Sequence, residues 1–249
     1  MSKIVFCNND IKKIKYSGYT ITKAYACGGE LVYSADTTPD CSEPMPNELW
    51  KVKFEYENGD VAYIAKGNNT SAKTSDFSSY VTRYCDGQVM LNYHSYYRDI
   101  NNIVKATFNT NTTYIGKGFL SGSTSLEDVY IQNCNSPTVI DTGAFKSCSE
   151  LKEVLLCNTI TTITSEAFRY CTSLKSITIP SSVVSIGMYA FANTGLINIV
   201  MLPKTPPTAG YYMFENDTAL TSICVPASAV ETYKQAPRWS DYSSLIKTC

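Results

Sequence analysis

The sequence has few charged residues and only one histidine, and both shortages exclude classes of function. Lysine, arginine, aspartate and glutamate make up 17% of the 249 residues, and the formal net charge is −1. Because such a weak field attracts neither nucleic acid nor anionic lipid, we expect no nucleic-acid partner. The only histidine, His94, lies among tyrosines without a partner motif. We interpret it as structural and not catalytic.

Other signatures of chemistry are missing as well. No Cys-x-x-Cys pair and no phosphate-binding glycine loop occur, so we predict no metal and no cofactor. No apolar run approaches the roughly 20 residues of a membrane helix, which predicts no membrane insertion. The opening residues 1–10 do not resemble a signal peptide, so we expect a soluble protein that is synthesised in a cytosol. We predict a binding protein and not an enzyme. A glycan-active enzyme using carboxylates of the tyrosine-rich region 77–100 is the weaker alternative.

In place of catalytic motifs, the second half of the chain has a repeat. Phe119, Phe145, Phe168, Phe191 and Phe214 are spaced 26, 23, 23 and 23 residues apart. A fixed period in the twenties is typical of stacked coils, in which each unit completes the core of its neighbour. A strand pattern Leu-x-x-Ile-x-Ile recurs with it, at Ile103/Ala106/Phe108, Leu126/Val129/Ile131, Leu151/Val154/Leu156, Leu174/Ile177/Ile179, Leu196/Ile199/Met201 and Leu220/Ile223/Val225.

The ten cysteines of the chain favour thiols over disulfides. Cys148 and Cys171 lie one repeat apart, each three residues after a repeat phenylalanine, which is typical of a small buried residue recurring in a stack. Adjacent coils would also allow this pair to oxidise. Because the start of the chain predicts a cytosolic origin, we expect the cysteines to be reduced.

Turn and cap signals divide the chain into five parts. Asn58-Gly59 predicts a β-hairpin, and Val89–Leu91 is a candidate strand. Ser228 and Glu231 have capping-box spacing, so we expect a helix to start near Ser228 and to end before Pro237, with Trp239 packing as part of a cap. The predicted parts are a small β anchoring or oligomerisation module (1–36), a Pro-rich linker (37–47), a β-rich region that packs on or caps the solenoid (48–102), the solenoid (103–226) and a C-terminal cap (227–249).

The central x of each strand pattern points away from the core, because side chains alternate along a strand. This outward row is apolar for a solvated surface, and an exposed apolar stripe beside polar side chains indicates a contact site for a partner. Two alternatives remain open: residues 48–100 fold back over the row, or the row reflects β-propensity alone. The candidate partner-binding residues are Thr107, Tyr130, Leu155, Thr178, Val200 and Cys224, and the polar row beside them is Lys105, Asp128, Glu153, Ser176, Asn198 and Ser222.

The repeat resembles the BspA-like, or treponemal-type, leucine-rich repeat, whose pattern is Ile-x-x-x-Ala-Phe, then Cys, then Leu-x-x-Ile-x-Ile-Pro. The likeness covers about residues 103–246, and the tail Val225–Lys234 with Trp239 resembles the family's C-terminal cap. It implies a mainly β leucine-rich-repeat solenoid with short helical turns and a C-terminal helical cap, preceded by small β modules. The matching residues of the clearest copy are Ala167, Phe168, Cys171, Leu174, Ile177, Ile179 and Pro180.

Two functional hypotheses follow from these resemblances. Ile21–Tyr25 and Glu30–Tyr33 resemble a short β module at the front of tailed-phage virion proteins. The leading hypothesis is therefore a phage structural protein, made in the host cytoplasm and carried on the virion. It would form homo-oligomers, contact other virion proteins and bind a host surface protein or glycan. The alternative is a bacterial cell-surface adhesin, which is what the repeat family implies.

Overall fold

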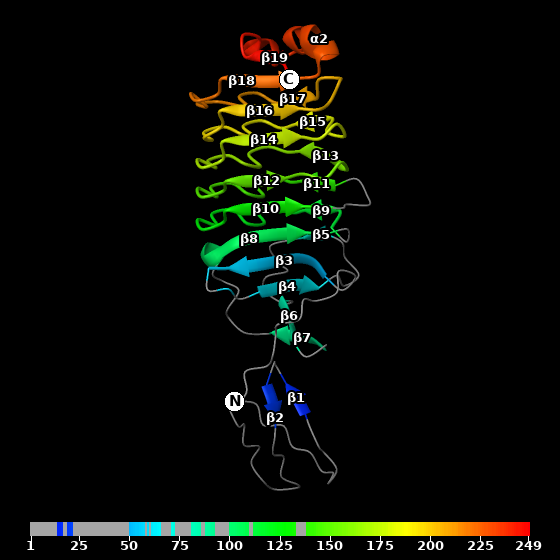
Figure 1. Cartoon of the computed structure of the whole chain (residues 1–249), viewed down its shortest axis with the longest axis vertical. Coiled ribbons are helices and arrows are strands. Elements are labelled where there is room, and N and C mark those ends of the chain that lie inside the picture. The colour runs from blue at the N-terminus through cyan, green and yellow to red at the C-terminus, as the bar shows by residue number, and fades with distance from the viewer. Residues whose placement is uncertain are drawn as a thin grey trace.

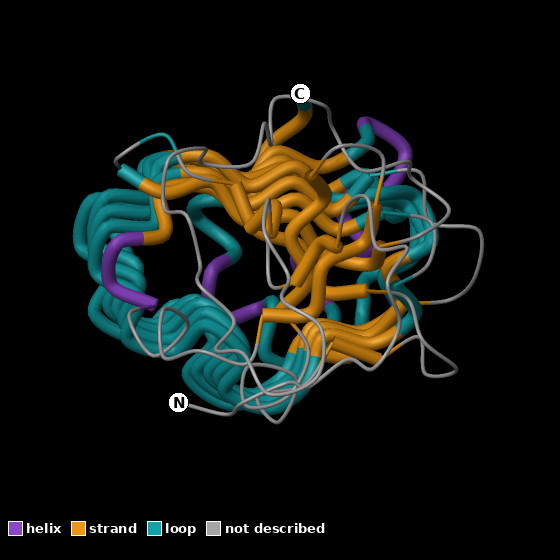
Figure 2. The backbone as a smooth tube through the Cα atoms, turned by 90° about the horizontal axis from the view of Figure 1, so that it is seen from below, coloured by secondary structure: helices purple, strands orange, loops and turns teal. Residues whose placement is uncertain are grey.

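The repeated half of the chain winds into a β-solenoid of about six turns, as the sequence predicts (Figure 1). The computed structural model describes residues 14–16, 19–21, 50–57, 59, 61–65, 71–72, 81–85, 88–92, 100–109, 112–132 and 138–249. Viewed along the stack, the turns superpose as two strand layers joined by loops (Figure 2).

The wider layer, which we call the strand wall, contains one strand from each turn. Its strands are parallel, and equivalent residues of successive repeats face one another within each hydrogen-bonded part of the wall, as in the pairing of Ile177 with Ile199. The strands of the wall are β8 (Ile103–Phe108), β10 (Asp128–Ile131), β12 (Glu153–Leu155), β14 (Ser176–Ile179), β16 (Asn198–Met201) and β18 (Ser222–Val225).

A second layer of shorter parallel strands completes each turn. It forms because a second apolar position in each repeat, such as Ile140 or Ile163, is fully buried against the strand wall. Its members are β5 (Ser71–Ala72), β9 (Tyr114–Ile115), β11 (Thr138–Ile140), β13 (Ile160–Ile163), β15 (Ser185–Ile186) and β17 (Thr208–Ala209).

The predicted core positions of the strand pattern are confirmed. All are buried except Leu156, which is partly buried at the end of its strand. Phenylalanines of the turns stack behind them, with ring centroids 5.3 Å apart for Phe145 and Phe168 and 5.5 Å apart for Phe168 and Phe191. A single apolar column therefore runs along the axis of the solenoid, and each turn supplies one layer of it.

Phe119 does not belong to that column, contrary to its place in the sequence repeat. The Leu120 amide donates to the Ala144 carbonyl (2.8 Å), just as the Phe145 amide donates to the Ala167 carbonyl (2.9 Å). Leu120 is thus the equivalent of Phe145, and Phe119 takes the alanine position, where its ring packs 5.7 Å from Phe108. The first turn differs because its neighbour towards the N-terminus is not another repeat.

The N-terminal end of the wall is extended by antiparallel strands. The hairpin predicted at Asn58-Gly59 is confirmed, since β3 (Trp50–Tyr56) pairs with β4 (Val61–Ala65), and β3 also pairs antiparallel with β8. The predicted strand at Val89–Leu91 lies within β7. The remaining elements here are β6 (Val81–Cys85), β7 (Gln88–Asn92), η3 (Ile100–Asn102) and a separate antiparallel pair, β1 (Ile14–Tyr16) and β2 (Tyr19–Ile21).

Several predictions fall on residues outside the described ranges. The predicted linker 37–47, His94 and the motif Glu30–Tyr33 are among them. The division of the chain before residue 103 therefore stays a prediction.

The C-terminal end is covered by a short helical segment. Trp239 is fully buried, packs against Phe214 (ring centroids 6.4 Å apart) and donates its indole N–H to the Pro207 carbonyl (2.8 Å). The helix ends before Pro237, as predicted, but the capping box is wrong: Ser228 lies in a 3-10 turn, and no side chain caps the helix. The elements are η4 (Ala227–Ala229), α2 (Val230–Gln235), η5 (Ser240–Tyr242) and β19 (Ile246–Thr248), which pairs with β18.

Candidate binding face

The structure brings the predicted contact residues together on the outer side of the strand wall. Parallel register pairs Thr107 with Tyr130 and Tyr130 with Leu155. Farther along the stack, Thr178 pairs with Val200 and Val200 with Cys224. We call these six residues the outer row. None of the six is buried, and Leu155 is 44% exposed. Whether the outer row binds a partner stays a prediction.

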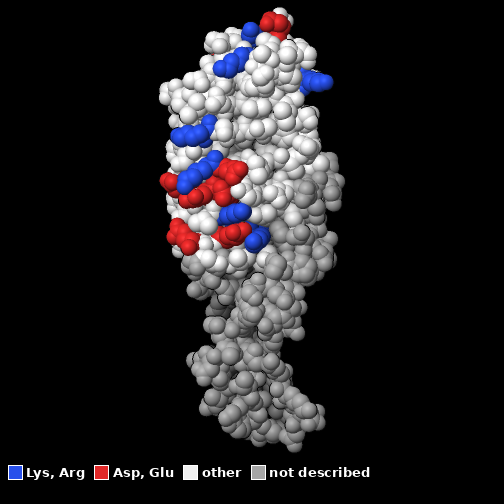
Figure 3. Space-filling view, in the orientation of Figure 1, with Lys and Arg blue, Asp and Glu red and all other residues white. Residues whose placement is uncertain are grey.

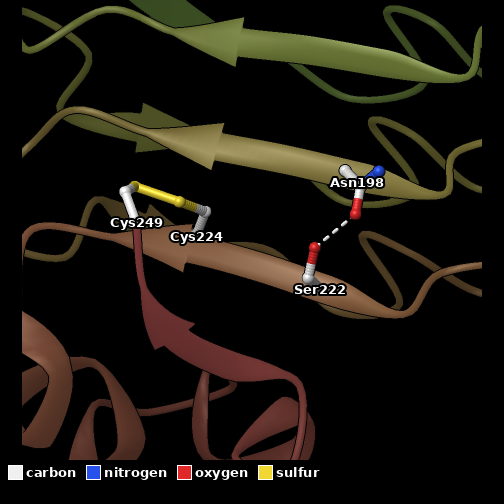
Figure 4. Close-up of a disulfide and its surroundings, with 4 residues drawn as sticks. All are labelled: Asn198, Ser222, Cys224 and Cys249. Atoms are coloured by element: carbon white, nitrogen blue, oxygen red, sulfur yellow. Dashed lines mark hydrogen bonds between the residues drawn. A yellow bond between two sulfur atoms is a disulfide. The ribbon is translucent and has the colours of Figure 1, made fainter.

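The polar row runs beside the outer row on the same side of the wall. Register places Lys105 opposite Asp128, and Asp128 opposite Glu153. Ser222 departs from the expectation of an exposed polar row, since it is only 4% exposed. Its hydroxyl donates to the side-chain carbonyl of Asn198, and this bond joins two turns (Figure 4).

The N-terminal half of the face is charged and internally bonded. The Lys105 ammonium lies 4.3 Å from the centroid of the Tyr130 ring, and the Tyr130 hydroxyl donates to Glu153 (2.7 Å). That bond, first among several causes, raises the pKa of Tyr130 to about 12. Burial, followed by repulsion from Glu153, raises the pKa of the Asp128 carboxyl. The strand residues of this half therefore hold one another in place.

The two rows carry no charged side chain in the C-terminal half of the face, and the next cation in register is Lys247 of β19, which pairs with Cys224. From Leu155 onward the two rows present aliphatic, hydroxyl and amide groups, and Figure 3 shows the charged side chains gathered mainly over the lower described turns. A contact surface there would be desolvated without breaking ion pairs, because uncharged groups lose less hydration than charged groups when they are buried.

A disulfide lies at the C-terminal end of the outer row, which corrects the prediction of thiols. Cys224 is bonded to Cys249, the last residue of the chain, so strand β19 is tied to β18 (Figure 4). Cys157 is also disulfide-bonded. The prediction holds for Cys148 and Cys171, which are free and fully buried. Spacing identified the two cysteines of the repeat correctly, but it carried no information about the pairing of Cys224 with the chain end.

Sequence reasoning missed a second exposed surface on the turns. Its tyrosines, Tyr170, Tyr189, Tyr211 and Tyr212, form what we call the tyrosine ridge. The rings of Tyr189 and Tyr212 stack 5.4 Å apart, and the Arg169 guanidinium lies 4.7 Å from the Tyr189 centroid. Arg238 covers Tyr211, which like Tyr212 is 55% exposed. The sequence did contain a signal for this ridge: Tyr189 and Tyr212 are 23 residues apart, which is one repeat, and so occupy equivalent positions of neighbouring turns.

Among the residues that the structure describes, no group of three or more histidine, cysteine, aspartate or glutamate side chains could hold a metal ion. No described helix is long and apolar enough to cross a membrane. The geometry of the strand wall suits non-covalent docking along several turns.

Parallel strands repeated once per turn, with apolar residues at fixed positions inside, define a leucine-rich-repeat solenoid. The model of the BspA type leucine-rich repeat region matches residues 88–152 and 138–237 in six copies. These matches cover more than half of the chain, which therefore belongs to the BspA-type leucine-rich repeat family. Among curated proteins, none matches the chain.

Three solved structures match the chain at low identity and with TM-scores below 0.5. They are a leucine-rich repeat protein from Bacteroides ovatus ATCC 8483 (16% identity, TM-score 0.40, 74% of this chain and 48% of that one) and the pneumococcal vaccine antigen PcpA (16%, 0.42, 69% and 46%). The third is a leucine-rich cell surface protein from Faecalibacterium prausnitzii A2-165 (21%, 0.37, 74% and 55%). The chain spans about half the length of each of these proteins.

Proposed function

We propose that the protein is an adhesin-type binding protein of a bacterial cell surface and that the strand wall is its docking face. The observation that carries the proposal is the contrast along the wall: charged residues bonded to one another up to Glu153, then an uncharged stretch that begins at the exposed Leu155. An apolar exposed patch rimmed by polar groups is typical of a protein contact site. We expect the partner to be a protein or a neutral glycan.

The disulfides support a location outside the cytosol. Disulfides such as Cys224–Cys249 form and persist in oxidising surroundings, whereas cytosolic thiols are kept reduced. This favours the cell-surface hypothesis over a virion protein matured in a host cytoplasm. The family match does not point to a virion protein. Of the two motifs that suggested one, Glu30–Tyr33 lies outside the described residues, and Ile21–Tyr25 is described only at Ile21. Homo-oligomerisation through residues 1–36 remains a prediction.

A pair of matched variants tests the docking face. Leu155→Glu combined with Thr178→Glu puts two carboxylates into the uncharged stretch, and Val184→Glu adds one at a 62% exposed site just before β15 in the second layer. Binding of the purified chain to epithelial cell monolayers, before and after deglycosylation, is the measurement. Because central contact residues contribute more than about 1.4 kcal/mol, we expect at least a tenfold loss of affinity for the double variant.

The control should bind like the unmodified chain, and both variants should keep its circular dichroism spectrum. Equal affinity for the double variant and the unmodified chain would exclude the strand wall as the docking face. Location is tested separately, by antibody labelling of intact cells that express the full protein. Labelling confined to the cytosol, or to phage particles, would overturn the cell-surface proposal.

A further inference from the structure

One position of each turn holds a short side chain, and in three successive turns this side chain donates a hydrogen bond to the preceding turn. It lies three residues after Leu120 or the equivalent phenylalanine. Cys148 donates its thiol to the Leu120 carbonyl and Cys171 to the Phe145 carbonyl, each at 3.2 Å, and the Ser123 hydroxyl donates to Ile100. We call the whole set the donor column: Ser123, Cys148, Cys171, Thr194 and Asp217.

Asp217, the last member of the donor column, is the one that cannot donate while it is ionised. Its side chain is 9% exposed. One carboxylate oxygen accepts both the Thr194 amide (2.6 Å) and the Thr194 hydroxyl (3.0 Å). The other oxygen is buried and has no hydrogen-bond partner in the structure. A carboxylate only accepts, so this oxygen gains a partner among acceptors only when it carries a proton.

An acceptor is unoccupied at the equivalent place. Cys171 donates to Phe145, 26 residues earlier, and the residue 26 positions before Asp217 is Phe191. Within residues 138–249 no hydrogen bond reaches the Phe191 carbonyl, because the Thr194 amide that would close the turn bonds to Asp217 instead. By equivalence with the Cys171 bond, we infer that the buried carboxyl oxygen of Asp217 faces this carbonyl, which lacks a donor. A proton on Asp217 would satisfy both groups.

We propose that Asp217 carries a proton in the tightly closed stack, and that losing this proton at higher pH loosens the last turn and the cap. The carboxyl lies in the turn of Phe214, whose ring packs against both Trp239 and Tyr242. An uncompensated charge there would draw water to the contact between the solenoid and the cap. Protonation of Asp217 would make the stability of the C-terminal end of the solenoid depend on pH.

The surroundings of Asp217 contain no compensating cation. Burial is the main cause that raises its pKa, to about 6, and the two bonds from Thr194 oppose it. Tyr242 faces it from η5, with the carboxylates Glu215 and Asp241 acting on the same phenol. No lysine or arginine is among the groups that shift the pKa of Asp217. The charged groups that act on the neighbouring Tyr242 are acidic as well.

The sign of the pH effect follows from the direction of the shift. The folded state holds the proton more tightly than the unfolded chain, whose aspartate has the ordinary pKa of about 3.9. The stabilisation is complete below that value and is lost as the pH rises through about 6. Across this window the folding equilibrium should fall by up to about a hundredfold, because each unit of pKa difference corresponds to about tenfold.

The test compares denaturant unfolding of the full chain at pH 4.5 and pH 7.5, together with hydrogen exchange of the Tyr242 and Cys249 amides. Asp217→Asn keeps the shape, cannot ionise and retains a donor. We expect its stability to change little between the two pH values. The unmodified chain should be less stable at pH 7.5, and the protection factors of its cap amides, which correct for the faster intrinsic exchange at that pH, should fall. Asp241→Asn, at an exposed carboxyl nearby, is the matched control and should follow the unmodified chain.

A carbon-13 NMR titration of the Asp217 carboxyl in the unmodified chain serves as a check that needs no variant. A midpoint near 6 supports the proposal, and a midpoint below about 4.5 overturns it, because the buried oxygen would then be ionised throughout. The same conclusion follows if the Asp217→Asn and unmodified chains show the same dependence of stability on pH.

Discussion

At the scale of single residues, two positions in each of five successive turns have a left-handed backbone. One is Gly118, Gly143, Glu166, Tyr189 or Tyr212, with φ between 57° and 61°, and the other is Gly122, Ser147, Tyr170, Asn193 or Asn216, with φ between 57° and 81°. Bulky residues are unfavourable in this region by roughly 1 kcal/mol. Stacking of Tyr189 on Tyr212 offsets part of that cost and explains how tyrosine is accepted where two other turns have glycine.

Close approach of two turns accounts for a different glycine. A Cβ added to Gly187 would lie 2.4 Å from the Ser165 nitrogen, so neighbouring backbones would have to separate. We expect Gly187→Ala to lower the free energy of unfolding by about 1–3 kcal/mol, as overpacking does in well-packed cores. Denaturant unfolding measures it.

Gly122→Ala is the comparison for that substitution, since a Cβ there meets nothing within 4 Å and only the left-handed φ of 81° is unfavourable. It should cost about 1 kcal/mol. An equal or smaller loss for Gly187→Ala would show that the turns can separate at little cost.

The buried thiols of the donor column should be unreactive in the folded protein. Burial raises the pKa of Cys148 to about 12 and that of Cys171 well above its ordinary value, so neither forms the reactive thiolate at neutral or mildly alkaline pH. In the folded chain we expect neither to react with a thiol reagent at pH 8, and both to react in denaturant. Mass spectrometry of the modified peptides decides the outcome. Rapid labelling of Cys171 in the native protein would contradict the buried position.

At the scale of elements, β19 depends on a covalent bond as well as on packing. It is a three-residue edge strand in which only Ile246 is buried, and the bond between Cys224 and Cys249 closes a separation of 25 residues. Crosslinks of this length stabilise by about 3 kcal/mol in the chain-entropy model. The short strand alone would bury too little surface to remain paired.

Cys249→Ser should therefore release β19 selectively. We expect the Cys249 amide, which donates to the Val225 carbonyl (3.3 Å) in the unmodified chain, to lose its protection in hydrogen exchange at residue 249. The backbone amides of Phe145 and Phe168, whose rings stack on each other, should keep their protection because they lie several turns away. Reduction of the unmodified chain with dithiothreitol provides the control, and it should reproduce the effect. Full protection of residue 249 in the variant would mean that packing alone holds the strand.

At the scale of the whole molecule, the two ends of the solenoid are covered by different kinds of structure. The N-terminal end continues the strand wall with the antiparallel strand β3, and the C-terminal end is covered by Trp239, Tyr233 and β19. An uncovered turn would expose its apolar layer, and repeat proteins need capping units for that reason.

Deleting residues 227–249 should convert the chain into an aggregating species. The deletion removes Trp239 and Tyr242, both of which pack on Phe214, and so exposes the last layer of the core. We expect size-exclusion chromatography to show oligomers or loss of soluble protein. Trp239→Phe, which keeps an aromatic ring but loses the bond to Pro207, should elute like the unmodified chain and have lower stability. A fully stable deletion variant that elutes without added aggregate would show that the last turn closes itself.

The sequence by itself determined the winding of the repeated half, its buried positions and the outward direction of the outer row. Period and alternation are local properties, and each turn makes the same contacts with the next, so one good copy such as 163–180 predicts the others. Only the tertiary structure decided three further features. Leu120 replaces Phe119 in the apolar column, Cys224 is bonded to Cys249, and the Asp217 carboxylate accepts a hydrogen bond from the Thr194 amide. These features depend on what lies beside the first and last turns, where the repeat has no neighbour of its own kind and periodicity stops being informative.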